Sequence, residues 1–172
     1  DLKAAPRGGL SASGARIMAD RHSRRDRGAA VRYPEASDRE GSGMYIPPHF
    51  NEISADEIGR IIEAAPLACI VAQTPQGLIA NHIPLLSGPG GRLIGHVALA
   101  NDMHRLIGDG QEVLAVFRGE DGYVSPNFYP SKAEHHRHVP TWNYQVVHAY
   151  GAIRFQHDDH AKRAAVGLLA RI

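Results

Sequence analysis

Between residues 54 and 66, apolar side chains recur at the spacing of an α-helix and so share one face: Ile58, Ile61, Ile62 and Ala65. Ser54 is followed three residues later by Glu57, which is the pattern of a capping box at the start of a helix. Pro66 cannot lie in a helix interior because its ring removes a backbone N–H donor. The pattern therefore predicts a short amphipathic helix that begins after Ser54 and ends before Pro66.

Short apolar runs separated by Gly- and Pro-containing turns follow this helix, and they are typical of antiparallel strands. We expect strands over six ranges: 67–72, 78–86, 92–98, 112–118, 123–125 and 147–156. Turns at 74–77 and 87–91 predict that the first three strands are linked as hairpins, and 101–107 predicts a helical turn. Many short strands with few helices predict a mainly β, α+β fold built as a small antiparallel barrel.

The two ends of the chain differ from this central part. Residues 1–43 carry nine basic and six acidic side chains, with a single aromatic, Tyr33, and they show no sustained apolar period. Such a segment buries too little apolar surface to offset its ordering entropy, so we expect a disordered N-terminal extension. The basic run 21–27 also fits a nucleic-acid arm, although we favour a solvated charged tail. At the other end, a helix is expected from about residue 158, cut mid-course where the sequence stops at Ile172.

Charge and cysteine content narrow the class of protein. The formal net charge is +1 over 172 residues, which argues against a domain-wide surface for nucleic acid. The single cysteine, Cys69, excludes an internal disulfide framework and a multi-cysteine zinc site. No apolar run approaches the roughly 20 residues needed to cross a bilayer. We therefore expect a soluble cytoplasmic protein with one folded domain over residues 44–172, preceded by the extension.

The stretch from Ser125 to Tyr144 is the densest in polar and aromatic residues, and a connection of this length favours a binding loop. Its aromatic rings would stack on a planar ligand, while Lys132 and hydroxyls such as that of Ser125 suit a phosphate. An equally good interpretation is that Trp142 and its aromatic neighbours close one end of a barrel core.

The histidines have competing interpretations as well. His135, His136 and His138, next to Glu134, could bind a transition metal, but neighbouring residues of an extended loop point in different directions, and a surface run of histidines is favoured. His82 and His96 each lie within an apolar run, where hydrogen-bonded core or rim residues are more usual than catalysts. Neither a Gly-rich phosphate loop before a helix nor a nucleophile elbow is found.

Six ordered motifs resemble the PaiB-type FMN-binding negative transcriptional regulators: MYIPPHF at 44–50, ANHIPLL at 80–86, GHVALAN at 95–101, YVSPNFYPSK at 123–132, VPTWNY at 139–144 and VHAYG at 147–151. The resemblance implies a split β-barrel of the FMN-binding type, related to pyridoxamine phosphate oxidases. It also implies a homodimer with FMN at the subunit interface. The extension before Met44 is not part of the family pattern, and the chain stops before the family's C-terminal strand, so the resemblance implies a C-terminally incomplete barrel.

The same resemblance implies where FMN is bound. The strand containing Asn81, His82 and Ile83 and the strand containing His96 would run beside the flavin and its ribityl chain, largely through backbone groups. Asn101 lies where related flavoproteins hold the phosphate. The remaining contacts implied are Ser125, Lys132, Trp142 and Asn143.

Three functions are compatible with these observations. The family resemblance implies a regulator that represses sporulation and degradative-enzyme genes, with promoter DNA as its partner. A flavin-dependent oxidoreductase is the alternative, because fold alone does not decide function. A haem- or metal-handling protein that uses the histidine cluster is the third. No helix-turn-helix pattern supports direct DNA binding. No catalytic acid, base or nucleophile can be assigned from the sequence, so the residues do not decide between a regulator and a flavin oxidoreductase.

Overall fold

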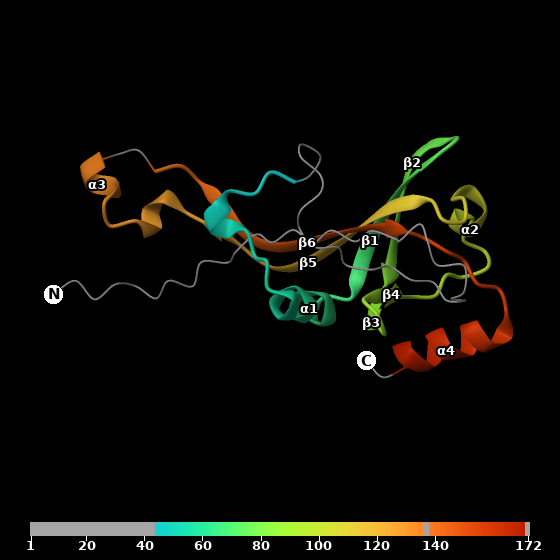
Figure 1. The fold of residues 1–172 in the computed structure, drawn as a ribbon. Helices are drawn as coiled ribbons and strands as arrows, with labels where there is room; N and C mark the ends of the chain where they lie inside the picture. The colour runs from blue at the N-terminus through green and yellow to red at the C-terminus, as the bar shows by residue number, and fades with distance from the viewer. Residues whose placement is uncertain (1–43, 136–137, 171–172) are drawn as a thin grey trace.

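The computed structural model describes residues 44–135 and 138–170, so the expected disordered extension at 1–43 lies outside the described residues. Figure 1 shows the elements in chain order. Two 3-10 helices and four α-helices are present in the described part: η1 (Pro48–Phe50), α1 (Ala55–Ala64), α2 (Met103–Leu106), η2 (Pro126–Phe128), α3 (Lys132–His135) and α4 (Asp159–Leu169). The strands are β1 (Leu67–Thr74), β2 (Gly77–Pro84), β3 (Leu86–Gly88), β4 (Arg92–Ile94), β5 (Glu112–Val124) and β6 (Thr141–Ala152).

The central element is an antiparallel sheet of four strands in the order β2-β1-β5-β6, accompanied by a separate two-stranded sheet of β3 and β4. Strands β2 and β6 are the edges of the larger sheet, so the described strands do not close into a continuous barrel. The mainly antiparallel α+β fold with few short helices is confirmed, and its open sheets agree with a split barrel.

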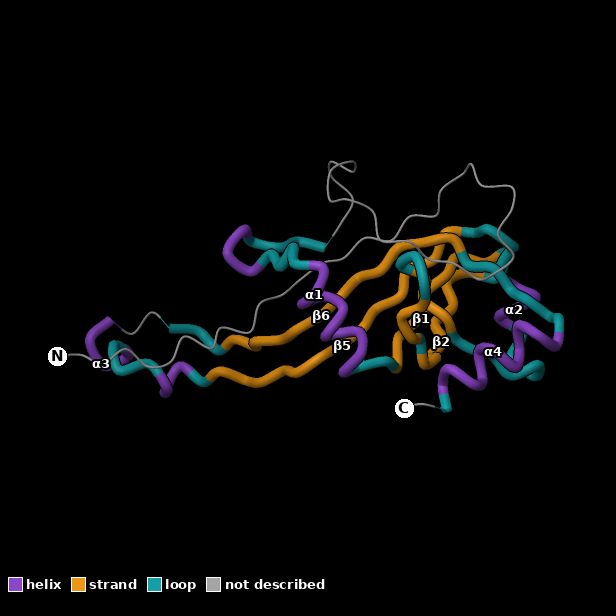
Figure 2. Tube along the Cα trace, turned by 60° about the horizontal axis from the view of Figure 1, so that its bottom comes forward, coloured by secondary structure: helices purple, strands orange, loops and turns teal. Residues whose placement is uncertain are grey.

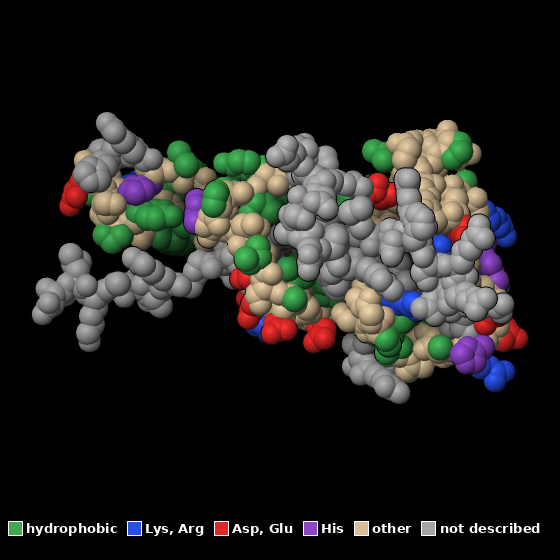
Figure 3. Space-filling model, in the orientation of Figure 1, with side chains coloured by type: hydrophobic (Ala, Val, Ile, Leu, Met, Phe, Trp, Pro, Cys, Tyr) green, Lys and Arg blue, Asp and Glu red, His purple; other side chains and the backbone are tan. Residues whose placement is uncertain are grey.

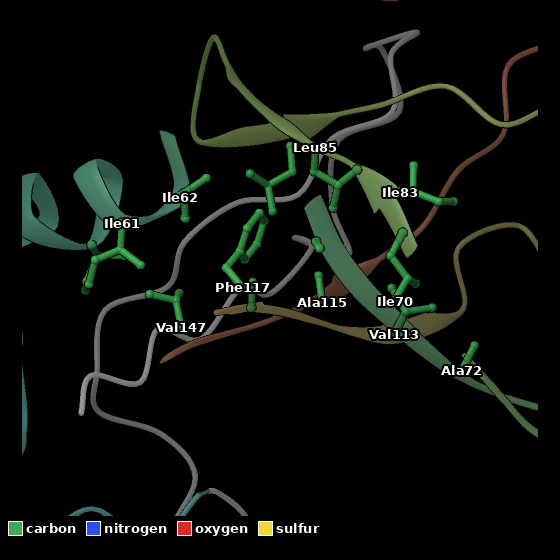
Figure 4. Packing of buried hydrophobic residues seen from close by; sticks show 14 of the residues in the cluster. Ile61, Ile62, Ile70, Ala72, Ile83, Leu85, Val113, Ala115, Phe117 and Val147 are labelled. Atoms are coloured by element: carbon green, nitrogen blue, oxygen red, sulfur yellow. The ribbon is translucent and has the colours of Figure 1, made fainter. Parts of the chain in front are cut away.

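Helix α1 forms as its sequence predicts and closes one side of the core. The Ser54 Oγ accepts a hydrogen bond from the Glu57 backbone N–H, and the predicted cap is therefore present. Figure 4 shows Ile61 and Ile62 on the side of the helix near Phe117 and Val147. Phe117, Val147 and Ile62 are fully buried, so the apolar stripe of α1 covers the inner face of β5 and β6.

Two of the predicted strand boundaries are wrong around the β2–β4 region. The expected strand 78–86 is divided between β2 and β3, and the expected strand 92–98 ends at Ile94. The Leu85 N–H donates to the Pro66 carbonyl at 2.8 Å, outside the β1–β2 ladder. Gly95 then approaches the Pro84 carbonyl so closely that an added Cβ would lie 2.6 Å from its oxygen. These two contacts direct the chain away from the β1–β2 ladder and over the core. Strands β3 and β4 therefore pair only with each other.

Strands β5 and β6 continue well past the rest of the sheet as a two-stranded ribbon, seen at the left of Figure 1. The predicted strands 112–118 and 123–125 are one strand, with a register irregularity between Arg118 and Asp121. The predicted strand 147–156 instead starts at Thr141 and ends at Ala152. We call the segment from residue 121 to 144 the distal ribbon, and the remaining described residues the body. The expected binding loop is thus partly ribbon, with η2 and α3 at its far end.

The two faces of the four-stranded sheet carry different residues. Residues opposite each other in an antiparallel pair share a face, so the register assigns each residue to one face. Its inner face carries the buried residues Ala68, Ile70, Ala115 and Ala149. The opposite face, called the outer face below, carries a row that crosses all four strands: His82, Cys69, Val116 and His148. No helix within the described residues combines the length and the apolar character needed to span a membrane.

Candidate functional site

Asn81 and Asn101, both predicted as site residues, are brought together in the body. The Asn101 Nδ2 donates to the Asn81 Oδ1 at 3.0 Å, which joins edge strand β2 to the turn before α2. The Asn101 Oδ1 accepts a hydrogen bond from the Met103 backbone N–H at 3.0 Å, and the Asn101 carbonyl lies 2.7 Å from the His104 Nδ1. Asn101 is therefore fixed through three different contacts. The Asn81 amide nitrogen has no hydrogen-bond partner among the described residues, so it is available to donate to a ligand.

His82 lies on the outer face next to Cys69 on β1, and its side chain is exposed. The surroundings of this pair are apolar, because Leu67 and Leu78 lie on the same face with 59% and 73% of their surface exposed. Such a surface is unusual for a strand that faces only water. It offers a flat apolar area with one imidazole donor at the edge of the sheet.

His148 lies in the same outer-face row, two strands away from Cys69. Its Nδ1 is shielded from solvent and has no hydrogen-bond partner among the described residues. Burial disfavours the charged imidazolium and lowers the pKa of His148 below its ordinary value. Sequence reasoning missed this histidine, although its position in the apolar run of β6 was a usable signal.

The other two predicted site residues of the body, Ile83 and His96, differ from each other in burial. Ile83 is 5% exposed and its side chain belongs to the core, so any contact with a ligand on the outer face is through its backbone. His96 is exposed and follows β4 in a segment without strand structure. The strand predicted around His96 is therefore absent. His96 itself lies in the body, two residues after the end of β4.

The distal ribbon carries the other predicted residues, and Trp142 is the largest of them. Its indole Nε1 donates to the Asp121 Oδ1 at 2.8 Å across the ribbon. The ring also packs at an angle against Tyr123, with 5.9 Å between ring centroids. Trp142 nevertheless keeps 51% of its surface exposed. The indole is thus held in one orientation with an open face, which suits stacking against a planar group.

Ser125, Lys132 and Asn143 lie near Trp142 along the chain and the ribbon. The Ser125 Oγ accepts from the Asn127 backbone N–H at 3.2 Å, and the Lys132 Nζ donates to the Asn127 Oδ1. Asn143 is half-buried opposite Gly122 in the ribbon. This group supplies one cation, a hydroxyl and an amide, which are the usual donors to a phosphate.

The histidine cluster is only partly described. His136 is outside the described residues, and so is the side chain of His135. The His138 Nε2 lies 2.9 Å from the Ser131 Oγ, and its ring stacks on Tyr129 with 4.5 Å between centroids. Within the part of the chain that the structure covers, no three His, Cys, Asp or Glu residues come together as a metal site would require. The metal hypothesis gains no support from this geometry.

The predicted site residues fall into two groups that one chain does not bring together. Asn81, His82, Ile83, His96 and Asn101 belong to the body, whereas Ser125, Lys132, Trp142 and Asn143 belong to the distal ribbon. Figures 1 and 2 both place α3, at the end of the ribbon, at the opposite end of the molecule from α2. Hydrophobic side chains gather around the ribbon end in Figure 3, and the exposed ones include Tyr123, Phe128, Tyr129 and Val139.

The combined chemistry of the two groups fits FMN. A dianionic phosphate needs a cation and N–H or O–H donors, and the isoalloxazine ring needs an apolar or aromatic slot with a few directed donors. Lys132, Ser125 and the Asn81 amide supply the first requirement, and the open Trp142 face with the apolar outer face supplies the second. The cation, the hydroxyl and the indole come from the distal ribbon, whereas the amide pair and the apolar sheet face come from the body.

Asp121 is a supporting residue that the sequence did not single out. It accepts hydrogen bonds from Trp142 and, at 2.6 Å, from Arg118. It stands in the Gly-Glu-Asp-Gly run that sequence reasoning treated as a break between strands. Asp121 lies diagonally across the ribbon from Trp142, because its direct partner is Tyr144. This carboxylate would have been a usable signal only if the pairing of β5 with β6 had been known.

Comparisons with known proteins agree with this chemistry. Residues 44–171 match the family described as "Putative FMN-binding domain". The chain is 32% identical over 129 residues to "Protease synthase and sporulation protein PAI 2" of Bacillus subtilis, an alignment that covers 73% of this chain and 60% of that protein. It is 29% identical over 138 residues to an uncharacterized protein of Saccharomyces cerevisiae, with 67% of this chain and 81% of that protein covered. Because the family match spans well over half of its length, the chain belongs to this FMN-binding family, and FMN is its cofactor.

Proposed function

We propose that this protein is an FMN-dependent transcriptional regulator that acts as a homodimer, with each FMN held between the body of one copy and the distal ribbon of the other. The observation that carries this proposal is the separation of the two groups of site residues within one chain. A two-fold axis brings the ribbon of one copy to the body of its partner, and the reverse contact follows by symmetry.

The exposed surfaces of both regions support an assembly of this kind. A two-stranded ribbon is marginally stable by itself in water, yet the distal ribbon presents Trp142, Tyr123 and Phe128 to solvent. The body in turn exposes Leu67 and Leu78 on its outer face. Contact between the ribbon of one copy and the body of the other would remove both apolar surfaces from water.

Each residue of the composite site has a definite task in this arrangement. Lys132 supplies the positive charge for the phosphate, and the paired Asn81 and Asn101 present amide donors at a fixed position. Trp142, oriented by Asp121, covers one face of the ring and excludes water from it. When bound, FMN supplies a planar, redox-active ring, and the protein's part is to bind and orient it.

The regulatory role is supported by similarity to a Bacillus protein whose name refers to protease synthesis and sporulation. The alignment covers 60% of that protein, so functions carried by its other parts need not be shared. If the protein contacts promoter DNA, the basic run at 21–27 is the segment with suitable charge, and it lies outside the described residues.

Flavin titration and promoter binding together test this function. FMN fluorescence should be quenched on binding to the full chain, and Lys132→Ala should weaken the affinity at least about tenfold, because a charge-assisted contact to phosphate is lost. Arg163→Ala, which removes an exposed cation on α4, is the matched control and should leave the affinity unchanged. A promoter fragment should be retarded in a gel at lower protein concentration than random DNA. Equal retardation of the two DNAs, with rapid oxidation of NAD(P)H by the bound flavin, would instead establish the oxidoreductase alternative.

A further inference from the structure

A cavity of about 80 Å³ lies between the inner face of the four-stranded sheet and the chain segments that cross it. Strands β1, β2, β5 and β6 form one wall. Leu93 of β4 with the following segment, and the segment after β6, form the others. Of the residues assigned to flavin binding above, only Ile83 is among those that line it. Ile83 points into this cavity, whereas its neighbour His82 is on the outer face.

The lining of the cavity is apolar almost throughout. Side chains that enclose it include Ile70, Ile83, Leu93, Val97, Val113 and Phe155. Among the lining residues only Arg154 has a polar or charged side chain. A cavity with this lining offers water no partners, so it stays dry or takes an apolar group.

Arg154 is exposed to solvent although it contributes to the lining, so it stands where the cavity meets the surface. Three other arginines, Arg60, Arg105 and Arg118, each pair with a carboxylate three residues away in the sequence. Arg154 has no such ion-pair partner among the described residues. A guanidinium beside an apolar cavity is complementary to a molecule with a carboxylate head and a hydrocarbon tail.

We propose that this cavity binds a short-chain aliphatic carboxylate, with the hydrocarbon end inside and the carboxylate on Arg154. An engineered protein cavity of about 150 Å³ holds benzene, and a cavity about half that size accommodates a branched tail of about three or four carbons. The acid is therefore a small one, of the size of isovalerate, and a long fatty acid does not fit.

The position of the cavity allows its ligand to affect the affinity for FMN. Ile83 and Val97 line the cavity, and they adjoin His82 and His96 in the sequence. A tail that packs against Ile83 and Val97 stabilises strand β2 and the segment after β4 from the side of the cavity. If FMN binds beside those segments, the two ligands influence each other's affinity by the same factor. The carboxylate site itself does not depend on the proposed function.

Thermal unfolding of the full chain without FMN tests the carboxylate site independently of flavin binding. Sodium isovalerate should raise the unfolding midpoint in a concentration-dependent manner, because a ligand that binds only the folded state stabilises it. Sodium acetate, which lacks the tail, and isoamylamine, which carries the opposite charge, should give no such rise at matched ionic strength. Equal shifts with isovalerate and acetate, or with isovalerate and the amine, would overturn the proposal.

Two variants locate the binding to this cavity. Arg154→Gln should weaken the apparent affinity for isovalerate about tenfold, the loss expected for one charge-assisted contact, while Arg163→Gln on α4 should leave it unchanged. Ala149→Leu, which adds three carbons to a residue of the lining, should abolish the response by filling the space. Should Ala149→Leu fail to fold, the two arginine variants still decide the matter, since identical affinities for both and for the wild type would refute the site.

Discussion

The contact between Asn81 and Asn101 predicts a measurable energetic coupling between strand β2 and the turn before α2. Asn101→Ala removes the bond from its Nδ2 to the Asn81 Oδ1 and the bond from the Met103 N–H to its Oδ1. At about 1 kcal/mol for each net hydrogen bond, the variant should lose about 2 kcal/mol of unfolding free energy. Asn81→Ala removes only the shared bond and should lose about 1 kcal/mol.

The double variant separates this direct contact from independent effects. Because the shared bond can be lost only once, the double variant should lose about 2 kcal/mol, and the coupling energy should be about 1 kcal/mol. Urea unfolding followed by fluorescence, extrapolated linearly to water, measures all four proteins of the cycle. Asn51→Ala, at an exposed position between η1 and α1, is the control and should change stability by less than about 0.5 kcal/mol. Additive losses of about 3 kcal/mol would refute the contact.

Three further predictions concern packing and protonation. Gly95→Ala should destabilise the protein by about 1–3 kcal/mol in urea unfolding, because its Cβ would meet the Pro84 carbonyl. Gly59→Ala is the control: its added Cβ meets open space, so it should stabilise α1 by about 0.5–1 kcal/mol. Equal effects of the two substitutions would contradict the close approach of Gly95 to Pro84. Phe117→Ala, at a fully buried ring, should cost about 3–5 kcal/mol in the same assay, and a loss below about 1 kcal/mol would show that the ring is not in the core. The folded-state pKa of His148 lies below its ordinary value of 6.5, so the unfolded state binds more protons between the two values and stability should fall as the pH drops from about 7.5 to about 5.5. Stability measured against pH should fall less in His148→Gln, and identical pH profiles would exclude the histidine as the cause.

The parts of the fold that the sequence predicted well are those set by local signals. The Ser54 cap, the apolar face of α1 and the stop at Pro66 lie within thirteen consecutive residues, and they reproduce the observed helix. The β1–β2 hairpin followed likewise from its turn, where Gly77 adopts a positive φ of 112° that few other residues tolerate.

The parts that the sequence could not predict depend on contacts distant along the chain. The Gly-Glu-Asp-Gly run indicated a break between strands, but pairing with β6 keeps β5 continuous to Val124. Gly95 ended a predicted strand because of a contact with the Pro84 carbonyl eleven residues earlier. For the candidate site, motif resemblance selected both Asn81 and Asn101, yet their hydrogen bond depends on the fold that brings β2 to the turn before α2.

Flavin binding by a mixture of two defective variants tests the central proposal of a site shared between two copies. Asn101→Ala damages the body and Lys132→Ala damages the distal ribbon, so each homodimer should bind FMN weakly. After the two proteins are unfolded together and refolded at equal concentration, half of the dimers should be mixed, and each mixed dimer has one undamaged site. The proposal predicts that about one quarter of all sites regain wild-type affinity in an FMN titration. No recovery, in a mixture shown by mass spectrometry to contain mixed dimers, would contradict a site built from the body of one copy and the ribbon of the other.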